Sequence, residues 1–264
     1  RCRSGAGPGQ LMQPTDAGVK RRRILLGALA AVLVLLGIAA IAPRGDAMPP
    51  GETALFSSLP ILWPETDDPG LLLRADAPPH WARTVLEARG GLRPLDTLAV
   101  MPAGPDLLVM AQPRPMSPQE NVAVDGWLRA GGRVLLFADP ALTRHSAYAI
   151  GDRRRPQDLV LISPILARWG LQLSFAADQP AGDRLAPLLG LQVPVNLAGR
   201  FAPVPGSTGC AIADDGLVAR CRLGRGWLVA VADAAVLEEG DGQGADLALR
   251  RAALSRLMAT ALED

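Results

Sequence analysis

Polar side chains follow three apolar runs of this chain that are typical of buried strands. Gln112 and Arg114 follow "DLLVMA", Asp139 follows "RVLLFA", and Asp233 follows "WLVAVA". In an open α/β sheet the carboxyl ends of parallel strands lie along one edge, and ligands bind at that edge. We therefore expect these four side chains at one edge, as candidates to bind a ligand or a protein partner.

A charged loop, "YAIGDRRRPQD", follows the second of these runs, after His145. Its candidate side chains are Arg153, Arg154, Arg155 and Asp158. Two interpretations are open. The loop folds over the edge and contributes to a binding site, or it is a solvated loop whose charges pair with one another. The second is favoured, because a run of charges is usually a solvated surface whose pairs contribute little.

The sequence restricts the chemistry available at this edge. The junction after "DLLVMA" reads "QPRPMSPQE", which contains no Cys or His and no Ser before Ser117. The chain has no Gly-x-Ser-x-Gly elbow, phosphate loop or zinc-ligand spacing. We therefore expect no metal and no cofactor. The favoured hypothesis is a non-enzymatic domain that binds a partner or a small ligand. The alternative is a hydrolase that uses Asp139, Asp233 and His145.

The elements that position these residues begin with a central strand–helix–strand unit. "DLLVMA" is apolar after its first residue, as expected of a strand buried on both faces. Ser117 starts the motif Ser-Pro-Gln-Glu, a capping box with proline at the first helical position. Gly131 and Gly132 end this helix, and "RVLLFA" forms the next strand. The three segments make a right-handed βαβ unit.

Helix and strand signals alternate around this unit. The predicted helices cover residues 78–91, 163–170 and 244–262, and Ser163 is expected to cap the second. Short apolar runs at 59–63, 171–175 and 227–232 are strand candidates, and Pro94 favours an edge position for a strand at 92–98. Residues 176–208 are rich in proline and predict loops and short edge strands. The pattern indicates an α/β three-layer sandwich with a mainly parallel, flavodoxin-like sheet.

Cys210 and Cys221 lie on either side of a predicted hairpin. Asp215-Gly216 is a two-residue hairpin signal, and a loop of this length places the two cysteines directly opposite each other. A Cα separation of about 5.5 Å in such a pair suits a disulfide. We therefore expect a disulfide rather than two buried thiols, and no metal site at these cysteines.

The N-terminal region contains a membrane signal. Residues 24–42 are uncharged and mostly apolar, and they follow four consecutive cations. A helix of this length spans about 28 Å, which matches a hydrocarbon core of roughly 30 Å. The basic flank favours a cytoplasmic N-terminus. A cleaved signal peptide is the alternative, but the apolar run is longer than such peptides use, and Pro43 would follow the cut.

These signals divide the chain into four parts. They are a cytoplasmic basic tail at 1–23, a transmembrane helix at 24–42, a linker at 43–53 and an extracytoplasmic domain at 54–264. The net charge of +1 hides an excess of Asp and Glu over Arg from Gly51 onward. A mildly acidic domain argues against nucleic acid as a partner.

The run from "RPLDTL" through "DLLVMAQPRPMSPQENVAVDGWLRAGGRVLLFADP" to "GWLVAVADAAVL" resembles the class I glutamine-amidotransferase-like domain. It is most similar to the membrane-anchored domain of gliding-motility-type ABC-transporter auxiliary proteins and related bacterial proteins. The resemblance covers roughly residues 55–262 and implies a flavodoxin-type sandwich tethered by a transmembrane helix.

The resemblance also bears on activity. Amidotransferases place a Cys at the elbow after a central strand and a His-Glu pair further on, whereas both late cysteines of this chain lie in a hairpin and neither histidine is followed by such a Glu. This implies a catalytically empty copy of the fold. The expected protein is a single-pass component of the bacterial cytoplasmic (inner) membrane. It contacts the lipid bilayer through residues 24–42, and its periplasmic domain binds a protein partner in an ABC-type transport or envelope complex.

Overall fold

The computed structural model describes residues 48–66, 68, 70, 79–239 and 244–263. The chain divides into two compact units, Arg1–Gly45 and Asp46–Asp264, and every described residue belongs to the second. The expected transmembrane helix at 24–42 lies outside the described residues, as do residues 43–47 of the expected linker. Within the part of the chain that is described, no helix is long and apolar enough to cross a membrane.

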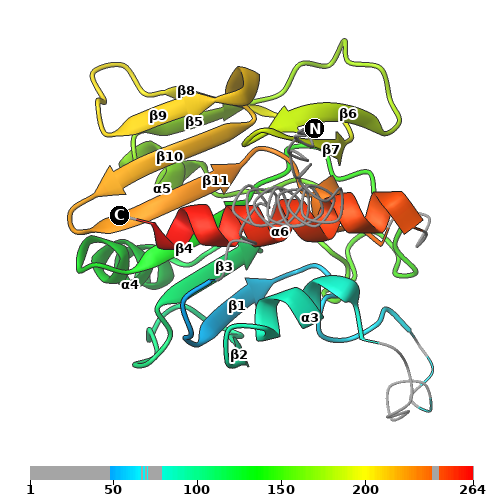
Figure 1. Ribbon diagram of the computed structural model, residues 1–264, viewed down its shortest axis with the longest axis horizontal. Helices are drawn as coiled ribbons and strands as arrows, with labels where there is room; N and C mark the ends of the chain where they lie inside the picture. Colours follow the sequence, from blue (N-terminus) through cyan, green and yellow to red (C-terminus); the bar gives the residue numbers. More distant parts are fainter. Residues whose placement is uncertain (1–47, 67, 69, 71–78, 240–243, 264) are drawn as a thin grey trace, which may run out of the picture. The chain divides into compact units, whose positions relative to one another are not determined.

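A seven-stranded sheet forms the centre of the domain, in the order β2-β1-β3-β4-β11-β10-β9 (Figure 1). Its strands are β1 (Thr53–Ser57), β2 (Leu92–Pro94), β3 (Leu107–Ala111), β4 (Arg133–Phe137), β9 (Cys210–Ala213), β10 (Val218–Leu223) and β11 (Gly226–Val231). The first five strands in the order pair in parallel, whereas β10 is antiparallel to both of its neighbours. The predicted α/β class and mainly parallel sheet are confirmed.

Two small antiparallel pairs flank the main sheet. β5 (Leu171–Ser174) pairs with β8 (Arg200–Pro203), and β6 (Arg184–Leu188) pairs with β7 (Leu191–Val195). Three of these strands come from the proline-rich segment 176–208, as the sequence predicts. Pro187 and Pro194 cannot donate to a ladder, so such strands do not belong in the interior of a sheet.

Helices cover both faces of the main sheet. The helices are α3 (Trp81–Glu87), α4 (Pro118–Arg129), α5 (Ser163–Arg168) and α6 (Gly244–Leu262). α6 contacts α3, β4 and β11, while α4 contacts β11. The connection from β1 to β2 runs along the sheet in the opposite direction to that from β3 to β4. Right-handed crossovers therefore place α3 and α4 on opposite faces, and α6 lies with α3 (Figure 1).

The start of β1 differs from the sequence prediction. β1 occupies Thr53–Ser57, and the apolar run 59–63 forms turns and bends after it. Pro60 has no N–H for a ladder hydrogen bond, while Leu59 and Ile61 are buried against the core. The run is therefore apolar because it packs over the end of β1 and not because it is a strand. The first described strand therefore begins at Thr53, the last residue of the expected linker.

The helix starts agree with the sequence at one helix and differ at another. Ser117 caps α4, and Glu120 completes the capping box. At α5, however, Ser163 is already in the helix, Ile162 precedes it, and no side chain caps the N-terminus. Buried Ile162 and Ile165 place this end of α5 against the core, so packing rather than a cap determines where the helix begins.

The hairpin from β9 to β10 carries the predicted disulfide. Cys210 and Cys221 are register partners and are bonded to each other. Their Cα atoms lie 4.0 Å apart, shorter than the expected spacing. The turn also differs, because Asp214–Gly216 form a short 3-10 segment in which both aspartates have positive φ. The expected register is confirmed even though the turn is longer than two residues.

Candidate functional site

The strand order reverses between β1 and β3, since the chain leaves β1 toward β2 on one side and β3 toward β4 on the other. Open α/β sheets bind ligands outside the carboxyl ends of the strands near such a point. Gln112 follows β3, Asp139 follows β4 and Asp233 follows β11. The structure therefore brings these three predicted residues to one edge of the sheet.

Gln112 is a buried clamp rather than an exposed ligand-binding group. Its side chain is fully buried, and its φ of 45° lies in the left-handed region. Its Nε2 donates to the carbonyls of Asp139, at 3.0 Å, and Gln157, at 2.8 Å. Its Oε1 accepts from the Asp139 N–H at 2.9 Å. Gln112 thus fixes the position at which the backbone leaves β4 and enters Asp139.

Arg114 is held by the start of α4. Its Nη2 lies 2.7 Å from Oε1 of Glu120, and its guanidinium stacks over Phe56 at 4.9 Å. Glu120 is almost completely buried, and the hydrogen bond from Arg114 holds the pKa of its carboxyl well below the usual range. Burial favours the neutral acid, but hydrogen bonds from Ser117, Leu98 and Thr97 add to the effect of Arg114.

Asp139 and Asp233 form a pair of buried carboxyl groups at the ends of adjacent strands. Asp139 accepts from the N–H groups of Ala141, at 2.8 Å, and Ala234, at 3.2 Å. Asp233 accepts from Asn196, at 3.0 Å, and Ala235. Neighbouring strands lie about 4.8 Å apart, so the two carboxyls share one environment.

Burial and mutual repulsion perturb the acidity of this pair. Burial raises the pKa of Asp139 to about 6. Burial also raises the pKa of Asp233 well above its usual value, and the charge of Asp139 raises it further. No cation contributes to either shift among the described residues. Two buried carboxyls without a counter-ion cannot both ionise near neutral pH, so the pair holds a proton there.

Glu238 is a third carboxyl group in this region, and the sequence analysis missed it. It follows the short helix η2 (Ala235–Leu237) in the connection from β11 to α6. Burial raises its pKa to about 7, and the charges of Asp183 and Asp139 contribute to the increase. Its Oε1 is buried and has no hydrogen-bond partner in the described part of the chain. Its place five residues after Asp233 was the only signal in the sequence.

Two arginines near Glu238 oppose the increase in its pKa only in part. Arg250 and Arg144 lower the pKa of Glu238, but burial and the neighbouring carboxylates outweigh them. The buried guanidinium of Arg250 is occupied by the carbonyl of Ala235 and by Asp246, whose Oδ2 lies 2.7 Å from Nε. Arg144 pairs with Glu65 at 2.7 Å. Both arginines are thus already neutralised by other partners.

Neither histidine completes a catalytic group with the aspartates. His145 is exposed, and among the described residues no hydrogen bond or ion pair joins it to Asp139 or Asp233. His80 caps α3, where its Nδ1 accepts from the Ala82 N–H at 3.1 Å. Burial lowers the pKa of His80, which favours a neutral capping imidazole. The described residues therefore provide no direct contact that joins His145 to the two aspartates.

The charged loop pairs mostly with itself, as the favoured interpretation predicts. Arg154 Nη2 lies 2.8 Å from Asp152, and Arg155 Nη2 lies 2.8 Å from Asp158. The Arg154 guanidinium also lies over the Tyr148 ring at 4.1 Å. Arg153 is exposed. In the described chain no group of three His, Cys, Asp or Glu residues is arranged to hold a metal ion.

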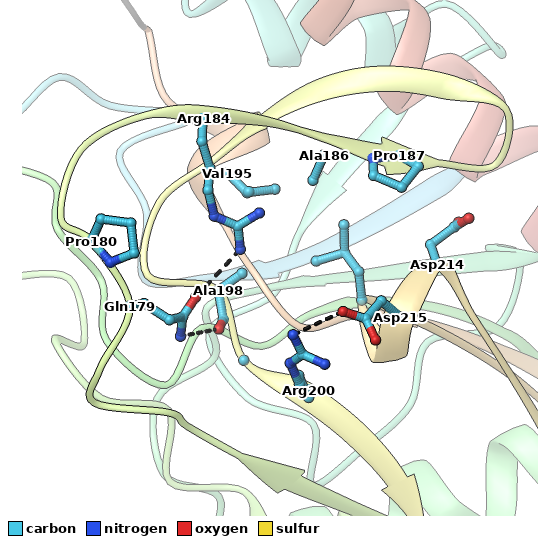
Figure 2. A pocket seen from close by; sticks show the side chains of 12 residues that line it. Gln179, Pro180, Arg184, Ala186, Pro187, Val195, Ala198, Arg200, Asp214 and Asp215 are labelled. Atoms are coloured by element: carbon cyan, nitrogen blue, oxygen red, sulfur yellow. Dashed lines mark hydrogen bonds and ion pairs between the residues drawn. The ribbon is translucent and has the colours of Figure 1, made fainter.

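Two cavities border this part of the fold. One, of about 630 Å³, lies at the carboxyl ends of β1 and β2 and is lined by Leu55, Trp63 and Asp96 among others. The other, of about 250 Å³, is shown in Figure 2. There Arg184 bonds to Gln179 and Arg200 pairs with Asp215. The second cavity therefore has its charges compensated by its own walls.

No protein-family model and no curated protein matches this chain. Solved structures with a similar fold include an exo-β-1,4-mannosidase from Opitutaceae bacterium strain TAV5, with a TM-score of 0.49 and 16% identity over 81% of this chain and 36% of that one. A β-galactosidase from Rahnella sp. R3 gives a TM-score of 0.43 and 14% identity over 80% of this chain and 31% of that one. This chain spans about a third of the length of these two glycosidases.

A ThuA-like protein from Bacteroides uniformis gives a TM-score of 0.43 and 10% identity, and the match covers 80% of this chain and 92% of that one. ThuA-like proteins have the class I glutamine-amidotransferase-like fold that the sequence resembles. The comparisons thus include a protein with this fold. They provide no match to the membrane-anchored gliding-motility family.

The prediction of a non-enzymatic binding domain, and with it an accessory role in a transport complex, was wrong. The finding against it is that the solved structures with a similar fold include glycosidases. The carboxyl edge is also not chemically empty, because Asp139, Asp233 and Glu238 all have raised pKa values there. The absence of an amidotransferase Cys removed one mechanism and left carboxyl chemistry open.

Proposed function

We propose that this domain is a hydrolase whose proton-transfer groups are the carboxyls of Asp139, Asp233 and Glu238. The observation that carries the proposal is the pair Asp139 and Asp233. These are two buried carboxyl groups on adjacent strand ends whose pKa values are both raised. Titratable groups with strongly perturbed pKa values at the ligand-binding edge of a fold are candidates for acid–base catalysis.

The three carboxyls suit different parts of a hydrolytic step. Hydrolysis needs one group that protonates the leaving oxygen and another that takes a proton from the attacking water. Glu238, with a pKa of about 7 and an unpartnered Oε1, is suited to donate the proton. Asp139 has the less strongly raised pKa of the pair and is ionised at neutral pH, so it is suited to accept one. Asp233 remains protonated beside it.

The step balances with water as the only co-reactant. The water oxygen forms a bond to the electrophilic carbon or phosphorus while the bond from that atom to the leaving oxygen breaks. Glu238 transfers its proton to the leaving oxygen, and Asp139 receives the proton that the water loses. Exchange with solvent then returns the proton from Asp139 to Glu238. Environments that separate the pKa values of neighbouring carboxyls are a general means of assigning these acid and base roles.

We also propose that residues 24–42 anchor this domain in the bacterial cytoplasmic membrane, with residues 54–264 outside the cytoplasm, as in the membrane-anchored amidotransferase-like proteins. The Cys210–Cys221 disulfide supports an extracytoplasmic location, because such bonds persist in oxidising compartments. Protease added to spheroplasts should degrade the domain while cytoplasmic proteins survive. A domain protected until the membrane is lysed would contradict the proposed orientation.

The hydrolase is tested with the full chain in detergent against 4-nitrophenyl esters, glycosides and phosphates between pH 5 and 9. Glu238→Gln should lower kcat/KM by at least about 100-fold, the usual effect of losing a general acid. It should also remove the decline in rate above about pH 7. Glu239→Gln, at the exposed neighbouring residue, is the matched control and should retain activity. Asp139→Asn should lower kcat/KM comparably.

Thermal unfolding of each variant separates lost chemistry from lost folding. The proposal fails if the wild-type chain turns over none of the three substrate classes. It also fails if folded Glu238→Gln and Glu239→Gln variants have the same activity.

A further inference from the structure

The cavity of about 630 Å³ has the size of a small-molecule site and lies beside the point at which the strand order reverses. Ligand pockets typically have volumes of about 300–1,000 Å³, with mostly apolar walls and a few polar groups. The floor here is apolar and comes from Leu55, Leu59, Pro60, Leu62, Pro94 and Leu95. The cavity can therefore bury the apolar part of a ligand.

One aromatic surface of this cavity remains open. Tyr148 also lines it, but its hydroxyl is occupied by the backbone of Thr66, and the guanidinium of Arg154 lies over its ring. Trp63, in contrast, is 69% exposed although it is a large apolar residue. An exposed Trp at the rim of an apolar cavity offers a face on which an aromatic ring of a ligand can stack.

The charges around the cavity leave one carboxylate without a direct partner. Arg154 is paired with Asp152, and Glu65 is paired with Arg144 and accepts from the Ala147 N–H. The carboxylate of Asp96, which is exposed, accepts no hydrogen bond from any residue that the structure describes. Arg114 donates to the carbonyl of Asp96 and acts electrostatically on its carboxylate, but the ion pair of Arg114 is with Glu120. The cavity therefore favours a ligand with a cationic group.

We propose that this cavity binds a molecule that carries an aromatic ring and a protonated amine, with the ring against Trp63 and the ammonium group at Asp96. The binding stands on the cavity alone. That this molecule is part of the substrate rests on the proposed hydrolase. Arg144 links the cavity to the proposed catalytic carboxyls, because it pairs with Glu65 in the cavity wall and acts electrostatically on Glu238.

Three probes of matched size test the ligand class with the full chain in detergent. They are 2-phenylethylamine, 2-phenylethanol and 3-phenylpropanoate, and ligand-observed NMR titration measures their dissociation constants. The amine should bind about two- to five-fold more tightly than the alcohol, as expected for one partly exposed charge pair. The carboxylate should bind more weakly than both.

Two variants assign this binding to the cavity. Asp96→Asn should remove the preference for the amine, whereas Asp178→Asn, at an exposed aspartate outside the cavity, should leave it. Trp63→Ala should weaken the binding of all three probes by about ten-fold, since stacking on an aromatic ring is worth about 1.4 kcal/mol. Val122→Ala, at an exposed apolar residue on α4, is its matched control.

The results separate this inference from the proposed hydrolase. The inference is overturned if none of the probes binds, if the wild-type chain binds all three equally, or if Asp96→Asn keeps the preference. Binding to Glu238→Gln should equal binding to the wild-type chain. If Glu238→Gln loses turnover but the wild-type chain binds no probe, the hydrolase stands and this inference alone falls.

Discussion

Replacement of Gln112 by alanine tests whether this side chain holds the carboxyl edge together. The sequence predicts Gln112 as a candidate to bind a ligand or a partner, but its side chain is fully buried and makes three hydrogen bonds to the backbone of Asp139 and Gln157. Gln112→Ala removes all three. We therefore expect the free energy of unfolding to fall, and the effect should be much larger than that of an exposed glutamine.

The magnitude follows from the groups left without partners. The Asp139 carbonyl still accepts from the Val160 N–H at 3.2 Å, so two groups are orphaned, the Asp139 N–H and the Gln157 carbonyl. Each unsatisfied buried group costs about 1–3 kcal/mol. A water that enters the space left by the side chain recovers part of this cost. The expected loss is about 3 kcal/mol, which lowers the Tm of a domain of this size by about 6–12 °C.

Urea denaturation followed by circular dichroism measures this loss. Gln119→Ala is the matched control, because Gln119 is an exposed glutamine on α4 near the same turn. The control should stay within about 0.5 kcal/mol of the wild-type chain, as exposed substitutions usually do. A loss below about 1 kcal/mol for Gln112→Ala, or equal losses in the two variants, would show that Gln112 does not clamp β3 to β4.

Three further predictions concern α4, the hairpin and the carboxyl pair. Ser117→Ala should cost about 1 kcal/mol in urea denaturation, because Ser117 and Glu120 cap α4 reciprocally. No loss would contradict this cap. The double replacement of Cys210 and Cys221 by serine should cost about 3 kcal/mol, the chain-entropy value for a loop of this length. An unchanged Tm would refute it. The pKa of Asp139 is raised to about 6, so the folded domain keeps a proton that the unfolded chain releases near pH 4. Stability from this group should therefore be present below about pH 4 and lost as pH rises to about 6, by about 1.4 kcal/mol per pH unit. Asp139→Asn should reduce the slope between pH 4.5 and 6, to which Asp233 and Glu238 also contribute, and an identical slope in both proteins would exclude the raised pKa.

The sequence predicted the structure correctly where the residues that determine it lie close together in the chain. The helix at α4 begins at Ser117 because the cap and Glu120 are three residues apart, and no distant residue is needed for that contact. Strand β3 is apolar along its whole length, and β4 is apolar after Arg133, because both faces of a parallel sheet are covered. The pairing of Cys210 with Cys221 also follows from spacing within one hairpin.

Local sequence patterns gave wrong predictions where packing against distant residues determines the secondary structure. The apolar run at 59–63 has the composition of a strand, yet it packs over the end of β1. Ser163 has the spacing of a cap, yet it lies inside α5. In each case the competing contact involves residues far away in the chain. Such contacts leave no periodicity in the sequence.

The candidate site also combines features that the sequence predicts with features that only the tertiary structure determines. By itself the sequence determined that Gln112, Asp139 and Asp233 follow buried strands, and hence that they meet at one edge, because parallel strands end together. Only the tertiary structure decided that Gln112 is buried as a clamp and that the charge of Asp139 acts on Glu238. Burial and the distance between charges set the pKa of a carboxyl group. Both depend on which segments pack around it, and residue type and position in the chain do not specify that packing.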